Sequence, residues 1–184
     1  MSVLMSRLRE LKNLLFRDDP VARHRRAGAV IGERVNIQGG VVIDPSHACH
    51  IEIGDDVTLA TRVHILAHDA STKRYLGFTR LGKVKIGNRV FIGGLSIILP
   101  GVAIGDDVVI GAGSVVCRDI PSGSVAAGNP AKVICSIQDF LDRRKKEMEI
   151  YPRFGIEYTD EVDVNHKLGG EMNQAMKDRF GYIL

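Results

Sequence analysis

The chain lacks tryptophan altogether and is poor in other aromatic residues, which make up 5% of its 184 residues. It also lacks any apolar run near the roughly 20 residues that a membrane-spanning helix needs. Its first sixteen residues, MSVLMSRLRELKNLLF, contain neither a continuous apolar stretch nor a small-residue cleavage site, so they do not resemble a secretory signal. We therefore expect neither a membrane-spanning protein nor a secreted one.

Net charge and cysteine are also sparse. The net charge of +3 is too small to indicate nucleic-acid binding, and no DNA- or RNA-binding motif is present. The three cysteines, Cys49, Cys117 and Cys135, form no C-x-x-C pair. An odd number of cysteines without a secretory signal predicts reduced thiols and a cytoplasmic location.

Glycine and aliphatic residues are abundant, and they recur with a period of six. The chain has 20 glycines and a hydrophobic content of 45%, enough to bury a core. Residues 86–121 read as IGNRVF, IGGLSI, ILPGVA, IGDDVV, IGAGSV and VCRDIP, and each block opens with Ile or Val. Similar blocks cover residues 31–48 and 53–70.

The six-residue period decides between fold classes. It does not keep one face of a 3.6-residue helix inward, and it is shorter than the 8–12-residue spacing of turns in ordinary hairpin sheets. It fits a solenoid in which each block forms one short face and eighteen residues form one coil. The first residue of each block is expected to point into the core.

Two interruptions of the repeat and two flanking segments define the predicted organisation. The repeat breaks at residues 45–52 and again at 71–85, where we expect an extruded loop over a cleft. The solenoid domain is predicted at 28–135, between an N-terminal helical cap at 1–27 and a C-terminal helical tail at 136–184. Within these ends, residues 3–16 have the pattern of an amphipathic helix that either caps the first coil or associates weakly with a membrane surface. Residues 136–149 are expected to form a helix with Ser136 as its N-cap.

His68 is the strongest candidate for catalysis. It lies in the block ILAHDA, directly before the 71–85 loop, at a position predicted to face outward near a corner. An unperturbed histidine has a pKa of about 6.5, which suits proton abstraction near neutral pH. The alternative is a surface histidine without a function.

The hexads, the segment IGDDVTLATRVHILAHD and the ending IGAGSVVCRDIPSGSVAAGNPAKVI resemble the hexapeptide-repeat acetyltransferases, especially the sugar O-acetyltransferases and the galactoside, maltose and xenobiotic acetyltransferases. The resemblance covers roughly residues 31–135. It implies an all-β solenoid, a left-handed parallel β-helix, with helices at both ends. It also implies a homotrimer with active sites at the subunit seams.

The resemblance further implies how the reaction proceeds. His68 would act as general base and take the proton of an acceptor hydroxyl, so that the acetyl group moves directly from acetyl-CoA without an acyl-enzyme. A backbone N–H at Gly93 or Gly94 would hold the thioester oxygen. The family places acetyl-CoA along the later coils, near Gly94, Ala112 and Cys117, with Lys132 at the phosphate-bearing end. The alternative reading of these glycines and alanines is that they are solenoid corner residues.

Acceptor-binding residues are less clearly matched. Asp44 is the nearest candidate for a sugar contact, and Asp69 could orient the base. In the loop, Arg74 and Tyr75 belong to a basic and aromatic stretch that suits an anionic sugar or a nucleotide-sugar. A solvated loop with a hydrophobic anchor explains the same stretch.

Two other functions stay open at this stage. One is N-acetylation of an amino sugar or nucleotide-linked amino sugar by the same fold, donor and base. The other is a γ-carbonic-anhydrase-like or non-enzymatic β-helix protein. A catalytic zinc needs three protein ligands, and the spacing of His64 and His68 does not match that of related γ-type enzymes, so we predict no metal requirement.

Overall fold

The computed structural model describes residues 19–158, 168–176 and 179–184. The chain divides into two compact units, Met1–Ile137 and Gln138–Leu184. The helix predicted at residues 3–16 lies outside the described residues. In the first unit, α2 (Pro20–Arg26) begins after Asp19, whose side chain caps it by accepting from the N–H of Val21 at 3.0 Å.

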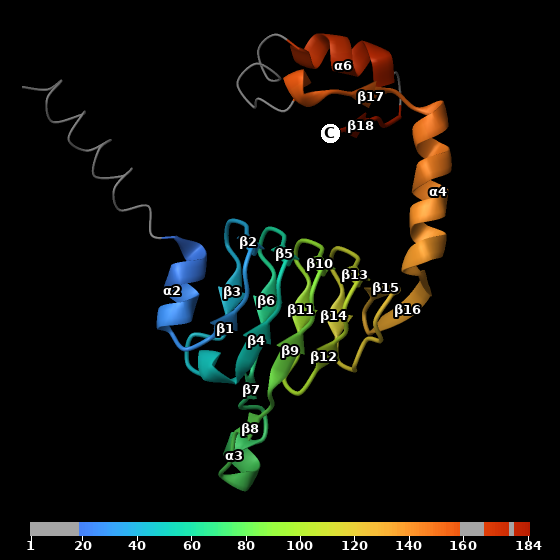
Figure 1. Cartoon of the computed structure of the whole chain (residues 1–184). Coiled ribbons are helices and arrows are strands. Elements are labelled where there is room, and N and C mark those ends of the chain that lie inside the picture. The colour runs from blue at the N-terminus through green and yellow to red at the C-terminus, as the bar shows by residue number, and fades with distance from the viewer. Residues whose placement is uncertain (1–18, 159–167, 177–178) are drawn as a thin grey trace, which may run out of the picture. The chain divides into compact units, whose positions relative to one another are not determined.

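Three sheets form the faces of the first unit, and the chain visits them in rotation (Figure 1); their strands are parallel except where β16 pairs with β15. We call them faces A, B and C. Face A consists of β1 (Val30–Ile31), β4 (Ile51–Ile53), β9 (Val84–Ile86) and β12 (Ala103–Ile104). Face B consists of β2 (Asn36–Ile37), β5 (Thr58–Leu59), β10 (Phe91–Ile92), β13 (Val109–Ile110), β15 (Ser124–Gly128) and β16 (Ala131–Ser136). Face C consists of β3 (Val42–Ile43), β6 (His64–Ile65), β11 (Ile97–Ile98) and β14 (Val115–Val116). The parallel pairing of short strands predicted from the hexads is confirmed.

The residues that open the hexads form the core. All of them are buried except Ile37, which packs against the core while partly exposed. Ser96 and Ser114 are also buried, and their hydroxyl groups donate to the carbonyl of Gly111 at 3.0 and 2.5 Å. The small polar residues of the repeat therefore satisfy their hydrogen bonds inside the core.

A row of side-chain oxygens joins successive coils at the corner between faces A and B. The backbone N–H of each corner residue donates to the side chain one coil further along: Glu33 to Asp55, Asp55 to Asn88, Asn88 to Asp106, and Asp106 to Ser122, at 2.7–3.0 Å. We call this row the corner ladder. It explains the glycine that follows each hexad opener of face A, because a Cβ at Gly32 or Gly87 would lie 2.3 Å from the ladder oxygen of the next coil.

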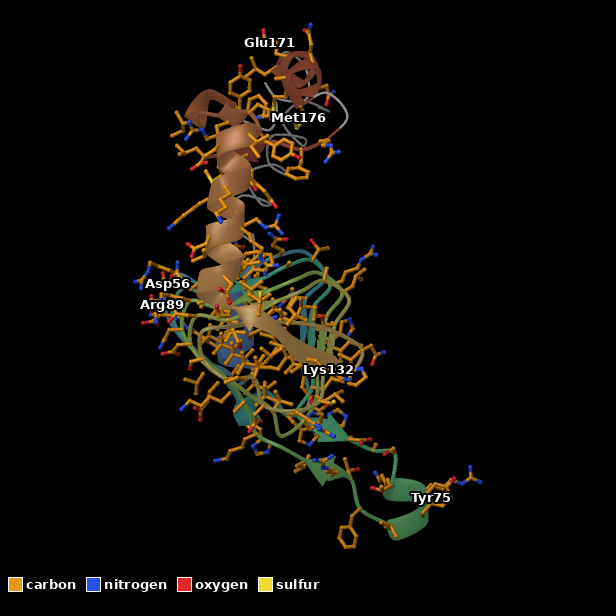
Figure 2. All side chains as sticks on the ribbon, turned by 90° about the vertical axis from the view of Figure 1, so that its right-hand side faces the viewer. Asp56, Tyr75, Arg89, Lys132, Glu171 and Met176 are labelled. Carbon is orange, nitrogen blue, oxygen red and sulfur yellow. The ribbon has the colours of Figure 1, made fainter. Side chains whose placement is uncertain are left out.

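Spacings along the corner ladder locate the insertions. Asn88 and Asp106 are 18 residues apart, which is one regular coil. Glu33 and Asp55 are 22 apart, and Asp55 and Asn88 are 33 apart. These coils therefore contain 4 and 15 extra residues. Beside the ladder, Arg34 pairs with Asp56 and Arg89 pairs with Asp107 (Figure 2 labels Asp56 and Arg89).

The larger insertion forms an arm that projects from the coil (Figure 1). Its base is an antiparallel pair of short strands, β7 (His68–Asp69) and β8 (Arg80–Leu81). Its tip holds α3 (Lys73–Leu76), which ends at Gly77 with a φ of +77°. Tyr75 and Phe78 on this arm are 83% and 79% exposed, so the tip presents apolar rings to the surroundings.

The end of the coil is closed by an antiparallel hairpin. β15 continues face B in parallel with β13, and β16 turns back along it. The second unit follows, with α4 (Ile137–Ile150), β17 (Arg153–Phe154), η2 (Ile156–Tyr158), α6 (Gly169–Met176) and β18 (Tyr182–Ile183). The helix predicted at 136–149 is displaced by one residue, because Ser136 is the last residue of β16. No helix in the described part of the chain is both long and apolar enough to cross a bilayer.

Candidate active site

The two interruptions of the repeat meet at the corner between faces C and A. The first follows β3 and includes Asp44, His47 and the short helix η1 (Ala48–His50). The second follows β6 and begins at His68, in the base of the arm. Because β3 and β6 are paired, with Ile43 opposite Ile65, the residues that follow each strand lie one above the other.

The side chain of Asp44 is the fixed point of this corner. It is fully buried, and its carboxylate accepts four hydrogen bonds. Oδ1 accepts from the N–H groups of Ser46 and His47 at 3.1 and 3.2 Å. Oδ2 accepts from the N–H of Ala67 at 2.9 Å and lies 2.5 Å from Nδ1 of His68. Burial by itself would raise the pKa of Asp44, but the hydrogen bonds from His68 and the backbone outweigh it and hold that pKa below its usual range.

The contact with Asp44 decides which nitrogen of His68 carries the proton. An ionised carboxylate only accepts, so Nδ1 of His68 must be the donor. In the neutral ring this leaves Nε2 as an acceptor. The His68 side chain is 34% exposed, so an acceptor group can reach the ring from outside. The corner therefore holds a histidine with a fixed tautomer and an accessible acceptor nitrogen, which is the arrangement of a general base oriented by a carboxylate.

A second imidazole lies against the first. The ring centroids of His47 and His68 are 4.7 Å apart, with an angle of 42° between the planes. Nδ1 of His47 lies 3.8 Å from Oδ1 of Asp44, which is too long for a hydrogen bond. Asp44, His47 and His68 each offer an atom within 4.8 Å of the others.

The structure corrects the predicted roles of two aspartates. Asp69 was expected to orient the base, but it is Asp44 that contacts the ring of His68. Asp69 instead accepts from the N–H of Ser71 at 2.8 Å, which lowers its own pKa. Asp44 was expected to contact the sugar, but its buried carboxylate is fully engaged with the protein. Asp69 points away from the ring of His68 because the two residues are neighbours in β7, and successive side chains of a strand face opposite sides.

The predicted loop contacts are not beside His68 within one chain. Arg74 and Tyr75 belong to α3 at the tip of the arm, whereas His68 belongs to β7 at its base (Figure 1 labels both elements, and Figure 2 labels Tyr75). Both are exposed. In a single chain these residues cannot complete the site at His68.

Most of the predicted donor-binding residues lie at the two edges of face C, whereas Lys132 lies on β16 of face B. Gly93 and Ala112 are stacked at the corner between faces B and C, where a Cβ on Gly93 would come 2.5 Å from the nitrogen of Ala112. Cys117 is exposed at the opposite corner, on the same side of the coil as His68. Lys132 is exposed on β16, beyond the last regular coil (Figure 2).

The backbone at this corner distinguishes the two predicted oxyanion donors. The N–H of Gly93 donates to the carbonyl of Ile110 at 2.8 Å, so it belongs to the coil-to-coil ladder and is not available to a ligand. Within the described ranges, the N–H of Gly94 donates no hydrogen bond. The prediction of Gly93 as a donor is therefore wrong, and Gly94 is the glycine with an available N–H.

Sequence reasoning missed the pairing of Asp44 with His68, although a signal for it exists. When the block IDPSHA is aligned with the block ILAHDA of the next coil, Asp44 aligns with Leu66. His68 comes two residues after Leu66. The hydrogen bond from Asp44 N to Ile65 O at 2.9 Å shows this register. The sequence does not indicate how far the irregular corner bends, so it cannot place the two side chains in contact.

Comparisons with known proteins agree with this architecture. A family model described as bacterial transferase hexapeptide (six repeats) matches residues 83–118. The putative acetyltransferase YvoF of Bacillus subtilis is 35% identical over 119 residues, which are 65% of this chain and 67% of that protein. Alignments to several other curated acetyltransferases span only about a third of those proteins.

Solved structures of acetyltransferases also superpose on this chain. A maltose O-acetyltransferase from Clostridium difficile 630 superposes with a TM-score of 0.53 at 35% identity, covering 71% of this chain and 83% of that one. A galactoside acetyltransferase in complex with coenzyme A superposes with a TM-score of 0.53 at 31% identity, covering 68% and 75% of the two chains.

Proposed function

Because the chain belongs to the hexapeptide-repeat acetyltransferase family, we propose that it transfers an acetyl group from acetyl-CoA to a hydroxyl group of a sugar or polysaccharide precursor, with His68 as general base. The observation that carries this proposal is the 2.5 Å contact between Asp44 and His68 at the base of the arm. Two of the similar proteins are named for maltose and galactoside, which supports a sugar acceptor. We also infer a left-handed coil, the handedness that hexapeptide repeats imply.

His68 and Asp44 divide the proton chemistry between them. Acetyl-CoA supplies the activated acyl group when it is bound. Nε2 of His68 takes the proton of the acceptor hydroxyl as its oxygen forms the new bond, and later delivers that proton to the departing sulfur. Asp44 stays ionised, keeps the proton on Nδ1 and stabilises the positive charge that the ring acquires. General-base catalysis of this kind contributes roughly 10²–10⁴-fold to the rate.

Face C provides a surface on which the pantetheine arm can lie. Its outward residues, Val42, His64, Ile97 and Val115, are half-buried and mostly apolar. Gly93, Gly94 and Ala112 at one of its edges are small, and Gly94 offers an unused N–H for the thioester oxygen. Lys132 carries a positive charge for the phosphate-bearing end. These residues fit acetyl-CoA by size and charge.

The arm supports a homotrimeric assembly. Its exposed Tyr75 and Phe78 form an apolar tip of a kind that marks interaction surfaces. An arm that reaches a neighbouring subunit would bring Arg74 and Tyr75 to the site of that subunit. Light scattering of the purified protein tests the trimer, and Tyr75→Ser with Phe78→Ser should shift it toward monomer. The odd number of cysteines and the use of acetyl-CoA favour the cytoplasm as the compartment in which the protein acts.

The central experiment compares the wild-type protein with His68→Ala. Calorimetry with CoA should give saturable binding at about one site per chain in both proteins, because His68 is not needed to hold the donor. Acetyl transfer to a panel of sugars should fall by roughly 10²–10⁴-fold in the variant. Unchanged turnover would exclude His68 as the base, and absence of CoA binding to the wild-type protein would exclude the acetyl-CoA reaction. Testing amine acceptors in parallel separates O- from N-acetylation.

A further inference from the structure

The His47 imidazole at the catalytic corner has no part in the acetyl transfer proposed above. We propose that Asp44, His47 and His68 form an inhibitory site for a divalent transition-metal ion, with zinc as the best match to the three donors. The inhibitory effect rests on the proposed role of His68 as general base, whereas the binding of the metal does not. The metal is thus a regulator of this corner and not a requirement of the reaction.

The geometry brings three ligand atoms almost to coordination distance. Zinc binds histidine nitrogen and carboxylate oxygen at about 2.0–2.2 Å, and tetrahedral angles then separate neighbouring ligand atoms by about 3.3 Å. Here Oδ2 of Asp44 is 2.5 Å from Nδ1 of His68, and Oδ1 of Asp44 is 3.8 Å from Nδ1 of His47. All three ligand atoms lie within 4.8 Å of one another. The widest separation therefore has to close by at most about 1.5 Å.

Metal binding requires small rotations of the two histidine rings, whereas the carboxylate of Asp44 can stay in place. Asp44 is fully buried and held by backbone N–H groups. The side chains of His47 and His68 are 31% and 34% exposed, so small rotations of either ring do not require the core to repack. A water molecule would then take the fourth coordination position once the rings have turned. Two imidazoles, one carboxylate and an open position make up the ligand set of a zinc site with three protein ligands.

A second observation points to a ligand at His47. Among the residues that the structure describes, its Nδ1 is the one buried side-chain nitrogen or oxygen without a hydrogen-bond partner. A buried polar atom left unsatisfied costs about 1–3 kcal/mol. The ring is nevertheless held near the Asp44 carboxylate, because the backbone N–H of His47 donates to Asp44 and the ring of His50 stacks on that of His47 with a centroid distance of 6.2 Å. A metal ion shared with Asp44 would satisfy this nitrogen.

Metal binding and base catalysis exclude each other through the tautomer of His68. Catalysis needs the proton on Nδ1 and a free lone pair on Nε2. A metal on Nδ1 displaces that proton, which moves to Nε2, so the ring stays neutral but Nε2 becomes a donor. The metal also takes up the Asp44 oxygen that would stabilise the protonated ring. Bound zinc should therefore stop proton abstraction without blocking face C, where the donor binds.

Binding is tested first, with zinc chloride alone and no substrate. Calorimetry of the full chain should show one zinc site per chain. His47→Ala should weaken that site by at least about 100-fold, because the loss of a direct ligand exceeds the 10–100-fold effect of losing a second-shell partner. Cys49→Ser is the matched control, since Cys49 is an exposed thiol in the same insertion and is itself a good zinc ligand. It should retain the site.

Inhibition is tested as a ratio of initial rates with and without zinc, so that a change in the basal rate of a variant does not affect the result. The ratio should fall by at least tenfold at zinc concentrations that saturate the calorimetric site, return to one with EDTA, and stay near one for His47→Ala. Calorimetry with CoA at saturating zinc should show that donor binding persists.

Each outcome decides between the alternatives. Loss of the site in Cys49→Ser with retention in His47→Ala would assign the metal to the thiol and overturn the proposal, as would the absence of a stoichiometric site. Binding without any effect on the rate would remove the inhibitory role. If the protein shows no acetyl transfer at all, the proposed function fails while calorimetry still decides the metal site.

Discussion

Replacing Asp44 by asparagine tests the central contact of the candidate site. The amide has the same shape as the carboxylate but only one acceptor oxygen. In the wild-type protein the two oxygens accept four hydrogen bonds, two on each side. Whichever way the amide is oriented, its NH2 group faces two donors.

The two orientations have different consequences, and both are unfavourable. With the NH2 group toward Ser46 and His47, the N–H of Ser46 loses its acceptor, which costs about 1–3 kcal/mol, while the N–H of His47 keeps only a long contact of 3.4 Å with the carbonyl of Asp44. With the NH2 group toward His68, the ring must accept through Nδ1, so Nε2 carries the proton and cannot act as a base. Either way the negative charge that stabilises protonated His68 is lost, and we expect kcat to fall by about 10²–10⁴-fold.

The assay is steady-state acetyl transfer, with KM for acetyl-CoA measured separately from kcat. We expect a large fall in kcat and little change in KM, because Asp44 does not line face C. Asp69→Asn is the matched control, since Asp69 is adjacent to the base but contacts Ser71, and its loss should be less than about tenfold. A kcat for Asp44→Asn within threefold of wild type, or a larger loss for Asp69→Asn, would refute the assignment of the orienting carboxylate.

Three further predictions concern stability. Ile92→Ala should lower the free energy of unfolding by about 2–5 kcal/mol, because Ile92 is fully buried, whereas Val30→Ala at an exposed outward position should have a small effect in the same denaturant titration. Gly87→Ala should destabilise strongly, because its Cβ would lie 2.8 Å from a backbone carbon of the next coil, and Gly39→Ala, with nothing within 4 Å, serves as the control in thermal melts. Burial and the nearby charge of Arg23 hold the pKa of His24 below its usual value. The unfolded chain therefore takes up the proton first as the pH falls below about 6.5, and stability present above that pH is lost. Melting curves at about pH 7.5 and about pH 5.5 should differ less for His24→Gln than for the wild-type protein.

The sequence predicted the regular part of the fold well because its pattern has one dominant physical cause. An aliphatic residue in every sixth position can be buried continuously only if each block forms one face of a coil. The glycine after each opener of face A has a second cause that the sequence did not reveal. It leaves room for the side-chain oxygen of the next coil at the corner ladder, where a Cβ would clash.

The irregular corner was predicted less well. His68 was identified by its place before the arm, but its partner was assigned to the neighbouring Asp69 and not to Asp44, one coil away. Contacts between coils depend on register, and the register changes by 4 residues at this point. Likewise, the sequence could not distinguish Gly93 from Gly94 as an N–H donor, because only the coil-to-coil hydrogen bonds show which of them is already engaged.

The corner ladder makes the coils interchangeable units. Each link joins a backbone N–H to a short polar side chain, which follows a glycine in every link except the last one, at Ser122. Two links that both follow a glycine can therefore be exchanged without new chemistry. Removal of residues 88–105 would join Gly87 to Asp106 and let Asp55 donate to Asp106 in place of Asn88, since both side chains already accept the same kind of hydrogen bond. The solenoid can therefore lengthen or shorten by whole turns, and the surface available to a ligand changes in steps of one coil. Asp44 and His68 precede that segment, so their contact does not depend on how many coils follow.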